Sequence, residues 1–121
     1  MEKTGETGST LWFKDAQKTI VGMKRVFGPM FGIPYFPDFI LRPYTLVEIP
    51  VSEDGDICTR FAHGKNQIRP LIFSHGLGAH SSFYTATYHA LAAHGYLVIA
   101  INHQDESCLF TEDKDGRNIP F

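Results

Sequence analysis

Two apolar segments with a helical pattern between them constrain this sequence more than any other feature. Pro70–Ser74 is a short apolar run and Tyr96–Asn102 is a second, and neither alternates polar with apolar residues. Such continuous strands are typical of a parallel sheet covered by helices on both faces. Between them, Ser81–His94 has helical spacing, with its first or second residue as the expected N-cap and Gly95 at the C′ position. Strand, helix and strand in about 33 residues predict a parallel βαβ unit and therefore an α/β fold.

A second helical pattern lies near the N-terminus. Apolar side chains recur at helical spacing over Leu11–Phe27, with Ser9 or Thr10 as the candidate N-cap. Basic residues between the apolar positions, together with Trp12, are compatible with a helix that attaches to a lipid surface. A helix that packs on its own protein shows the same stripe and is the more common case. The prolines and glycines of Gly28–Pro37 predict an irregular, aromatic-rich loop.

Two β-like segments connect this region to the βαβ unit. Thr45–Val51 and the weaker Ile57–Phe61 are separated by a polar stretch that contains Asp54 and Gly55, a strong turn signal. We therefore expect an antiparallel hairpin that leads into the parallel unit. The chain is divided accordingly into residues 1–44, the helix and aromatic loop, and residues 45–121, the α/β part.

Charge and cysteine content exclude several classes of function. The formal net charge is −2, whereas a dedicated nucleic-acid-binding domain carries a clustered basic excess, so no nucleic-acid partner is expected. Cys58 and Cys108 lie far apart and form no metal or redox pair, so reduced thiols are the simplest interpretation. The histidines show no consistent ligand spacing, and we expect no metal and no cofactor.

Targeting signals are weak as well. Met1–Glu6 is partly acidic and leads into no uninterrupted apolar stretch, which argues against a secretory signal. The most apolar stretch, Val26–Phe36, is broken by glycine and proline and is shorter than the roughly 20 residues of a membrane-spanning helix. We expect a cytoplasmic location, with peripheral membrane contact through the Trp12 helix as an open alternative.

The loop after the first strand of the βαβ unit is the segment suited to chemistry. Loops at the carboxyl ends of parallel strands form the functional crevice of α/β sheets. In Ser74–Ala79, Gly76 and Gly78 allow a sharp turn that presents backbone N–H groups to a ligand. Such donors stabilise the negative charge that develops on a carbonyl oxygen in acyl transfer. A dinucleotide-binding fingerprint is the weaker alternative, because Ser81 stands where its third glycine is required.

The loop is one of three segments that share a pattern: Pro70–Ala79, the Leu91–Tyr96 corner and Asn102–Ser107. Together they resemble the platelet-activating factor acetylhydrolase family, and the resemblance is strongest over residues 69–107. It implies the N-terminal part of an α/β-hydrolase fold. Members are serine hydrolases that cleave the short or oxidised sn-2 acyl chain from glycerophospholipids without calcium, so a glycerophospholipid is the expected substrate.

The resemblance also implies residue roles. The backbone N–H of Leu77 would be one oxyanion donor, and His75, Gly76 and Gly78 would shape the loop that carries it. The segment after the second strand matches a family signature through His103 and Asp105, with Gln104 where the family usually has arginine. We expect these two residues to brace loops near the crevice rather than to act in catalysis.

The catalytic triad of this fold is missing from the sequence. A serine nucleophile requires the Gly-x-Ser-x-Gly turn, and none of the six serines has glycine at both the −2 and +2 positions. We therefore expect an incomplete fold, a fragment of a phospholipid esterase that is inactive by itself. The alternatives are a non-catalytic module that binds lipid or a partner, and the head of another α/β-hydrolase carboxylesterase.

Overall fold

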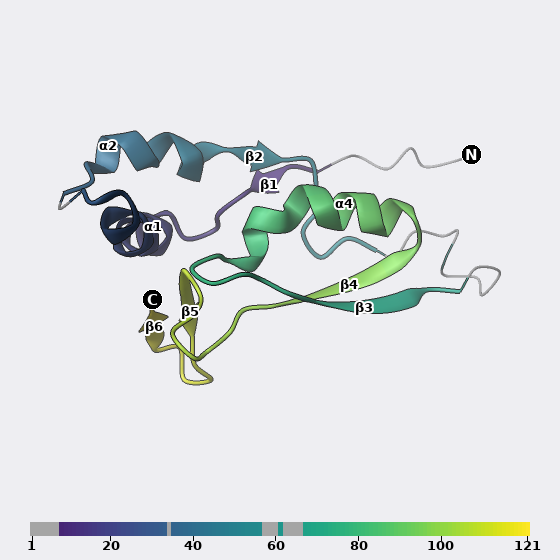
Figure 1. The fold of residues 1–121 in the computed structure, drawn as a ribbon. Helices are drawn as coiled ribbons and strands as arrows, with labels where there is room; N and C mark the ends of the chain where they lie inside the picture. Colours follow the sequence, from purple (N-terminus) through teal and green to yellow (C-terminus); the bar gives the residue numbers. More distant parts are fainter. Residues whose placement is uncertain (1–7, 34, 57–60, 62–66) are drawn as a thin grey trace.

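The parallel βαβ unit is present as expected. The structure, a computed structural model, describes residues 8–33, 35–56, 61 and 67–121 (Figure 1). Strand β3 (Arg69–Ser74) leads through a 3-10 helix, η2 (Ser81–Tyr84), into α4 (Thr85–Ala93) and then strand β4 (Tyr96–Ile101). The two strands pair in parallel along their whole length. Gly95 has φ of +85° and ends the helix in the left-handed region, as its C′ position requires.

The cap of the helical segment differs from the expectation. Neither Ser81 nor Ser82 caps it; the residue before them, His80, accepts a hydrogen bond from the Ser82 N–H through its ring Nδ1. An imidazole nitrogen therefore takes the role usually filled by a hydroxyl or carboxylate oxygen.

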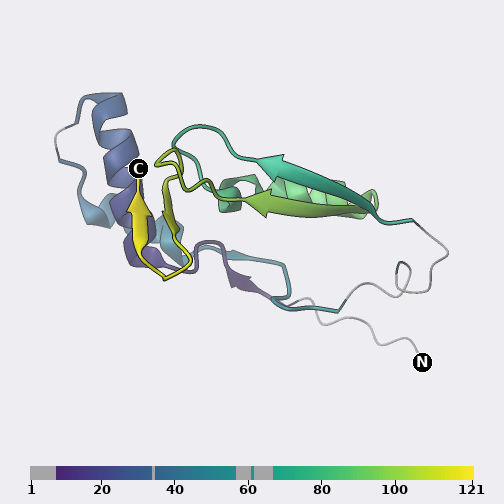
Figure 2. The same cartoon turned by 90° about the horizontal axis from the view of Figure 1, so that it is seen from below.

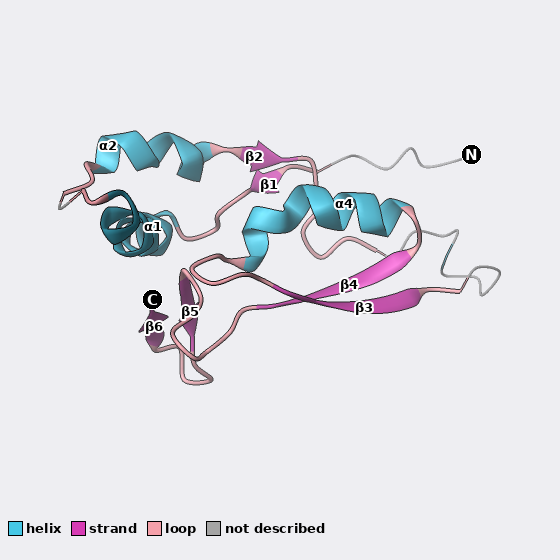
Figure 3. Ribbon diagram, in the orientation of Figure 1, coloured by secondary structure: helices cyan, strands magenta, loops and turns pink. Residues whose placement is uncertain are grey.

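One face of the two-stranded sheet is covered and the other is open. Helix α4 lies along the covered face (Figure 3), where Phe73 packs against the rings of Tyr84 and Tyr88 at centroid distances of 4.8 and 5.1 Å. On the other face, Ile72 is 68% exposed and Leu97 is 52% exposed. The expectation of burial on both faces is thus not met by the described residues, because α4 alone packs on the sheet.

The N-terminal helix begins later and ends later than its sequence pattern predicts. Helix α1 spans Ala16–Phe31, and its N-cap is Asp15, whose side chain accepts a hydrogen bond from the Lys18 N–H at 3.0 Å. Ser9 and Thr10 are therefore not caps. The expected Leu11–Phe27 helix is wrong at its start, because a good N-cap at position 15 fixes the first turn there.

The segment predicted to be an irregular loop is partly helical. Helix α1 continues through Pro29, and Gly32, with φ of +64°, terminates it. Backbone bonds from Gly32 N–H to the Pro29 carbonyl and from Ile33 N–H to the Gly28 carbonyl close the end. Pro29 lacks an N–H and removes one helical hydrogen bond, yet the helix continues to Phe31, so the prediction of irregular structure over Gly28–Pro37 was wrong for its first residues.

Of the expected hairpin, the first strand is shorter than predicted and pairs with another segment. Residues predicted as a strand begin instead inside a 3-10 helix, η1 (Arg42–Leu46), which follows the short helix α2 (Asp38–Leu41). Only β2 (Glu48–Ile49) is extended in a ladder, and it pairs antiparallel with β1 (Thr10–Leu11). The other half of the predicted hairpin, Ile57–Arg60, lies outside the described residues.

A further hairpin, which the sequence patterns did not reveal, lies at the C-terminal end. Strands β5 (Phe110–Glu112) and β6 (Asn118–Pro120) pair antiparallel beside α1 (Figure 2). In the turn, the Asp113 carboxylate accepts hydrogen bonds from the backbone N–H groups of Asp115 and Arg117. This side-chain cap holds a turn that the sequence marks only weakly.

The hydrophobic core joins the two regions of the chain. Its centre is Leu109, which is fully buried against α1. Gly22 of α1 comes so close that an added Cβ would lie 2.5 Å from the Leu109 carbonyl oxygen, which explains why glycine stands there. The remaining buried members come from the N-terminal region: Phe13, Ile20, Met23, Val26 and Leu41. The core thus holds the segment after β4 against the N-terminal helix.

Candidate oxyanion loop

The loop after β3 forms a tight turn. The Ala79 N–H donates to the Gly76 carbonyl at 3.0 Å, and Gly78 has φ of +71°. Leu77 is not among the residues with positive φ, so the turn has the form of type II, with Leu77 at its second position and Gly78 at its third. The third position of that turn needs a left-handed backbone, which is the role of Gly78.

The backbone amides of this turn differ in whether they are already bonded. The Gly76 N–H donates to the Tyr84 hydroxyl at 3.1 Å, and the Gly78 N–H donates to the Ser107 carbonyl at 2.7 Å. Ala79 closes the turn itself. The Leu77 N–H has no acceptor within the described part of the chain, and its side chain is 81% exposed. The turn therefore presents one backbone donor, that of Leu77, for a ligand oxygen.

His75 is held in place by both of its ring nitrogens. Nε2 accepts from the His103 backbone N–H at 3.1 Å, so in the neutral ring Nδ1 carries the proton and donates to the Gly76 carbonyl at 2.9 Å. The side chain is also buried. With both nitrogens bonded to the backbone, His75 connects the loop to the end of β4 and has no free position for a proton transfer.

The segment after β4 braces the loop along its length. In addition to the His103 and Ser107 contacts, the Leu109 N–H donates to the Ala79 carbonyl at 2.7 Å. The path of this segment is set by Asp105, whose carboxylate accepts hydrogen bonds from the Ser107 hydroxyl and N–H. These bonds lower the pKa of Asp105 below its usual value, with the hydroxyl contributing most. Asp105 thus acts on the loop through Ser107.

Ser74 and His103 also meet at the ends of the two strands. Ser74 Oγ and His103 Nε2 are 2.7 Å apart. Ser74 is the last residue of β3 rather than part of a strand-to-helix elbow. Within residues 67–121, no carboxylate hydrogen-bonds to His103 to orient it as a base. The pair therefore ties the strand ends together and does not form a catalytic dyad.

Comparison with known proteins identifies the family. The chain matches the family described as platelet-activating factor acetylhydrolase, isoform II, over residues 10–118. The chain belongs to this family. A platelet-activating factor acetylhydrolase of Cavia porcellus is 54% identical over 41 residues, which are 34% of this chain and 9% of that relative. Those of Gallus gallus and Bos taurus are 49% identical over 41 residues, again 34% of this chain and 10% and 9% of the relatives.

These matches cover only a small part of each relative. The aligned segment is about a tenth of the length of the acetylhydrolases it matches. No solved structure matches the chain. The family is therefore shown by the sequence match over residues 10–118, and the βαβ unit with its bonded loop shows what this part of the family sequence builds.

His80 lies behind the loop of this acetylhydrolase-family chain and is enclosed. Its ring stacks on Phe110 at 4.7 Å, Nδ1 faces the Ser82 N–H and hydroxyl, and Nε2 lies 3.1 Å from the Asn102 amide nitrogen. Burial, and secondarily the charge of His75, lower the pKa of His80 to about 4. The ring is therefore neutral near pH 7 and serves as a packing and hydrogen-bonding element.

Several residues of this site were not assigned a role from sequence. The Tyr84 hydroxyl bonds the loop from one turn into the following helical segment, and Ser107 bonds it through a backbone carbonyl. The tyrosine eight positions after Gly76 could have suggested the hydroxyl contact from sequence. The Ser107 contact could not be found in this way, because every residue has a backbone carbonyl. Among the described residues, no group of three His, Cys, Asp or Glu side chains could hold a metal ion.

Proposed function

We propose that the chain supplies the oxyanion loop of a calcium-independent phospholipid esterase that hydrolyses the sn-2 acetyl or short acyl ester of platelet-activating-factor-like glycerophospholipids. The observation that carries the proposal is the Leu77 N–H, unbonded within the described residues in a turn whose neighbouring amides are bonded. Membership of the acetylhydrolase family supports the substrate class. An α/β-hydrolase fold, of which the βαβ unit would be one part, belongs to the same proposal.

The mechanism assigns this chain one part of the reaction. A serine attacks the sn-2 carbonyl carbon, and the carbonyl oxygen becomes negatively charged in the tetrahedral intermediate. The Leu77 N–H donates to that oxygen, and the amide after the nucleophile supplies a second donor. Because this sequence contains no Gly-x-Ser-x-Gly, the nucleophile must come from other residues, and the 121-residue chain alone is inactive in this proposal.

The substrate class is tested with two esters. The chain, joined to the nucleophile-bearing sequence that the proposal requires, is expected to release acetate from 1-alkyl-2-acetylglycerophosphocholine in excess calcium chelator. The 121 residues alone should take no label from an active-site serine phosphonate probe. If the joined protein instead hydrolyses a water-soluble acetate ester and leaves the phospholipid intact, the chain is the head of a different carboxylesterase.

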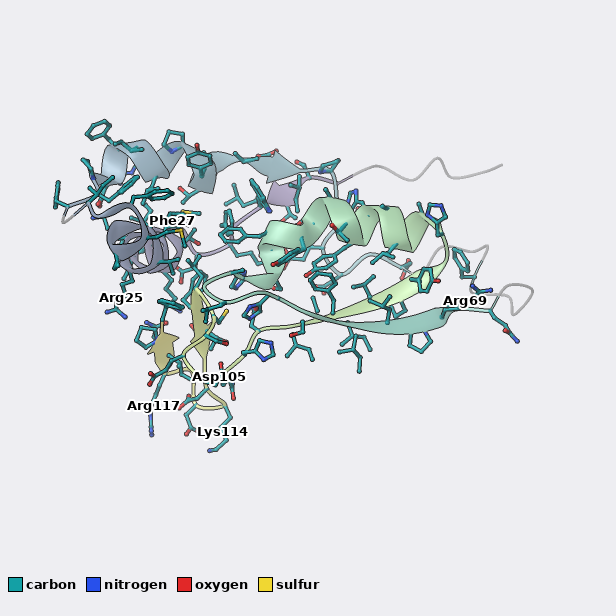
Figure 4. The ribbon with its side chains drawn as sticks, in the orientation of Figure 1. Arg25, Phe27, Arg69, Asp105, Lys114 and Arg117 are labelled. Carbon is teal, nitrogen blue, oxygen red and sulfur yellow. The ribbon has the colours of Figure 1, made fainter. Side chains whose placement is uncertain are left out.

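A second function, attachment to a lipid surface, is favoured by exposed apolar side chains. They gather at the end of α1, on α2 and on η1, and we call them the α1–α2 apolar surface: Met30, Phe31, Tyr35, Phe39, Tyr44 and Leu46. Figure 4 shows side chains projecting outward from α2 and from the segment between α2 and α1. Exposed apolar groups concentrated in this way mark sites that bind protein or membrane.

We propose that this contact does not use Trp12. Trp12 precedes α1, is half-buried, and donates from its indole nitrogen to the Ser82 carbonyl at 2.6 Å. It therefore packs inside the protein, as the alternative of a helix region packed on its own body anticipates. No helix in the described part of the chain is long and apolar enough to cross a membrane. The proposed contact is therefore peripheral, through the α1–α2 apolar surface.

Vesicle binding tests this surface. The double variant Phe31→Ser, Phe39→Ser is expected to bind phosphatidylcholine vesicles at least about tenfold more weakly, since each buried Phe contributes about 1.5–3 kcal/mol. Co-sedimentation measures the change. The control is Ile72→Ser, which removes a similarly exposed side chain from the open face of β3. An equal loss of vesicle binding in the control would show that vesicles adsorb nonspecifically to exposed apolar residues and not through this surface.

A further inference from the structure

An apolar cavity lies between α1, α2 and the start of the crossover segment. Its volume is about 370 Å³. Its walls include residues of α1 and α2, together with Phe83 of η2 and Trp12 and Phe13, which precede α1. All nine lining residues are apolar or aromatic: Trp12, Phe13, Met23, Phe27, Phe36, Ile40, Leu41, Tyr44 and Phe83.

This lining distinguishes the cavity from two larger cavities among the described residues. A cavity of about 490 Å³ beside β1 and β2 has Lys14, Asp15 and Glu53 in its wall. Another of about 830 Å³ at the end of α1 has Lys24 and Arg25 in its wall. Charged walls suit polar ligands or water. The 370 Å³ cavity presents hydrocarbon and ring surface, and its one indole N–H is already bonded to the Ser82 carbonyl.

We propose that this cavity binds a single hydrocarbon chain of a lipid molecule. An apolar protein cavity of about 150 Å³ is enough to hold benzene, so 370 Å³ accommodates a substantially longer apolar group. Aliphatic and aromatic walls with few polar groups are what an alkyl or acyl chain requires. A ligand with hydrogen-bonding groups along its length would leave those groups unpaired at a cost of several kcal/mol.

The exposed residues at the mouth of the cavity are suited to receiving a chain from a lipid surface. Ile40 and Tyr44 line it and are also exposed, and Tyr44 belongs to the α1–α2 apolar surface. Arg42 lies between the lining residues Leu41 and Tyr44 in the chain. It is exposed and makes no ion pair within the described residues, so its charge suits a carboxylate or phosphate head group. The inference rests on the proposed lipid-surface function, because that surface would deliver the chain to the mouth.

Trp12 provides a direct readout, since it is the single tryptophan of the chain and lines the cavity. Stearate that carries bromine near mid-chain is expected to quench Trp12 fluorescence saturably below the concentration at which the acid self-associates. A lysophosphatidylcholine with the same brominated chain separates a phospholipid source from a free fatty acid. Unbrominated stearate should compete and restore the fluorescence. Absence of saturable quenching by both brominated probes overturns the proposal.

A matched pair of variants locates the chain. Ile40→Trp places a larger side chain at the mouth and is expected to weaken radiolabelled stearate binding about tenfold in equilibrium dialysis. Ile33→Trp makes the same change at a similarly exposed position outside the cavity lining and should stay within about twofold of wild type. Equal loss in both variants would place stearate on the outer surface and overturn the proposal.

Vesicle co-sedimentation separates this inference from the surface function. Both tryptophan variants keep an apolar side chain on the surface, so both should bind vesicles as wild type does. If wild type fails to bind vesicles while stearate still quenches Trp12, the surface function fails and the cavity remains. If vesicles bind and neither brominated probe quenches Trp12, the cavity proposal alone fails.

Discussion

In the proposed esterase, replacing Leu77 with proline is expected to lower the turnover by about 10²–10³, the usual cost of losing one oxyanion donor. Proline has no backbone N–H, so the variant removes the proposed donor outright. The second position of a type II turn is also where proline is most readily accepted. Leu77 occupies that position, and Gly78 supplies the left-handed residue that follows it. The variant therefore removes a donor and leaves the turn in place.

The measurement is turnover with the acetylated phospholipid, together with the free energy of unfolding. Leu77→Ala is the matched control: it removes the exposed side chain and keeps the N–H, so its turnover should fall far less. Turnover of Leu77→Pro close to that of wild type, with the fold intact, would exclude Leu77 as the oxyanion donor.

The βαβ unit could be predicted from sequence because its signals are local. Two continuous apolar runs, a helical pattern between them and Gly95 at the helix end each specify one element. Whether an element packs on the second face of the sheet could not be predicted in the same way. A residue such as Ile72 has the same identity whether or not another element packs on it, and here it is exposed.

The predicted boundaries of the N-terminal helix were wrong for a different reason. Apolar periodicity continues from Leu11 into α1, but the side chain of Asp15 bonds the first turn and fixes its start. At the other end, Pro29 suggested an interruption, but it removes one helical hydrogen bond and the helix continues until the left-handed Gly32 ends it. In both places a specific capping contact outweighed the periodic pattern.

The sharp turn at Gly76 and Gly78 was expected from the sequence and is present, whereas its supports depend on tertiary contacts. Gly76 and Gly78 mark a sharp turn in any such sequence. That the Ser107 carbonyl and the Leu109 N–H hold this turn follows from the path of the chain after β4. That path in turn depends on Leu109 packing against Gly22, a contact between residues 87 positions apart that no local pattern encodes.

Acid is expected to destabilise the protein through His80, and the direction follows from its pKa. In the unfolded chain the ring has its ordinary pKa of 6.5, whereas burial lowers it to about 4 in the folded protein. Below pH 6.5 the unfolded state binds a proton that the folded state does not. The stabilisation is therefore complete above pH 6.5 and is lost as the pH falls toward 4. Allowing for partial exposure, the loss is about 2–3 kcal/mol.

The hydrogen-bond geometry gives the same sign. In the neutral ring Nδ1 accepts a hydrogen bond from the Ser82 N–H. Protonation places a hydrogen on Nδ1, so this bond is replaced by two donors that face each other, with Phe110 stacked on the ring and His75 adding repulsion. The carboxylates with lowered pKa, Asp15, Asp105 and Glu53, lose their stabilising charge as the pH falls below their ordinary values of 3.8, 3.8 and 4.5. Their contribution therefore begins at the acidic end of the range in which His80 acts.

Urea unfolding measured at several pH values between 7.5 and 4 tests this assignment. Wild type should lose stability steadily below pH 6.5, whereas His80→Asn should start less stable and lose less over the same range, because its side chain does not titrate. His89→Asn is the control, since His89 is exposed on α4 and has no hydrogen bond to this cluster within the described residues. An unchanged pH slope in His80→Asn would mean that another group causes the acid loss. A slope that flattens only in His80→Asn would assign it to the ring behind the oxyanion loop.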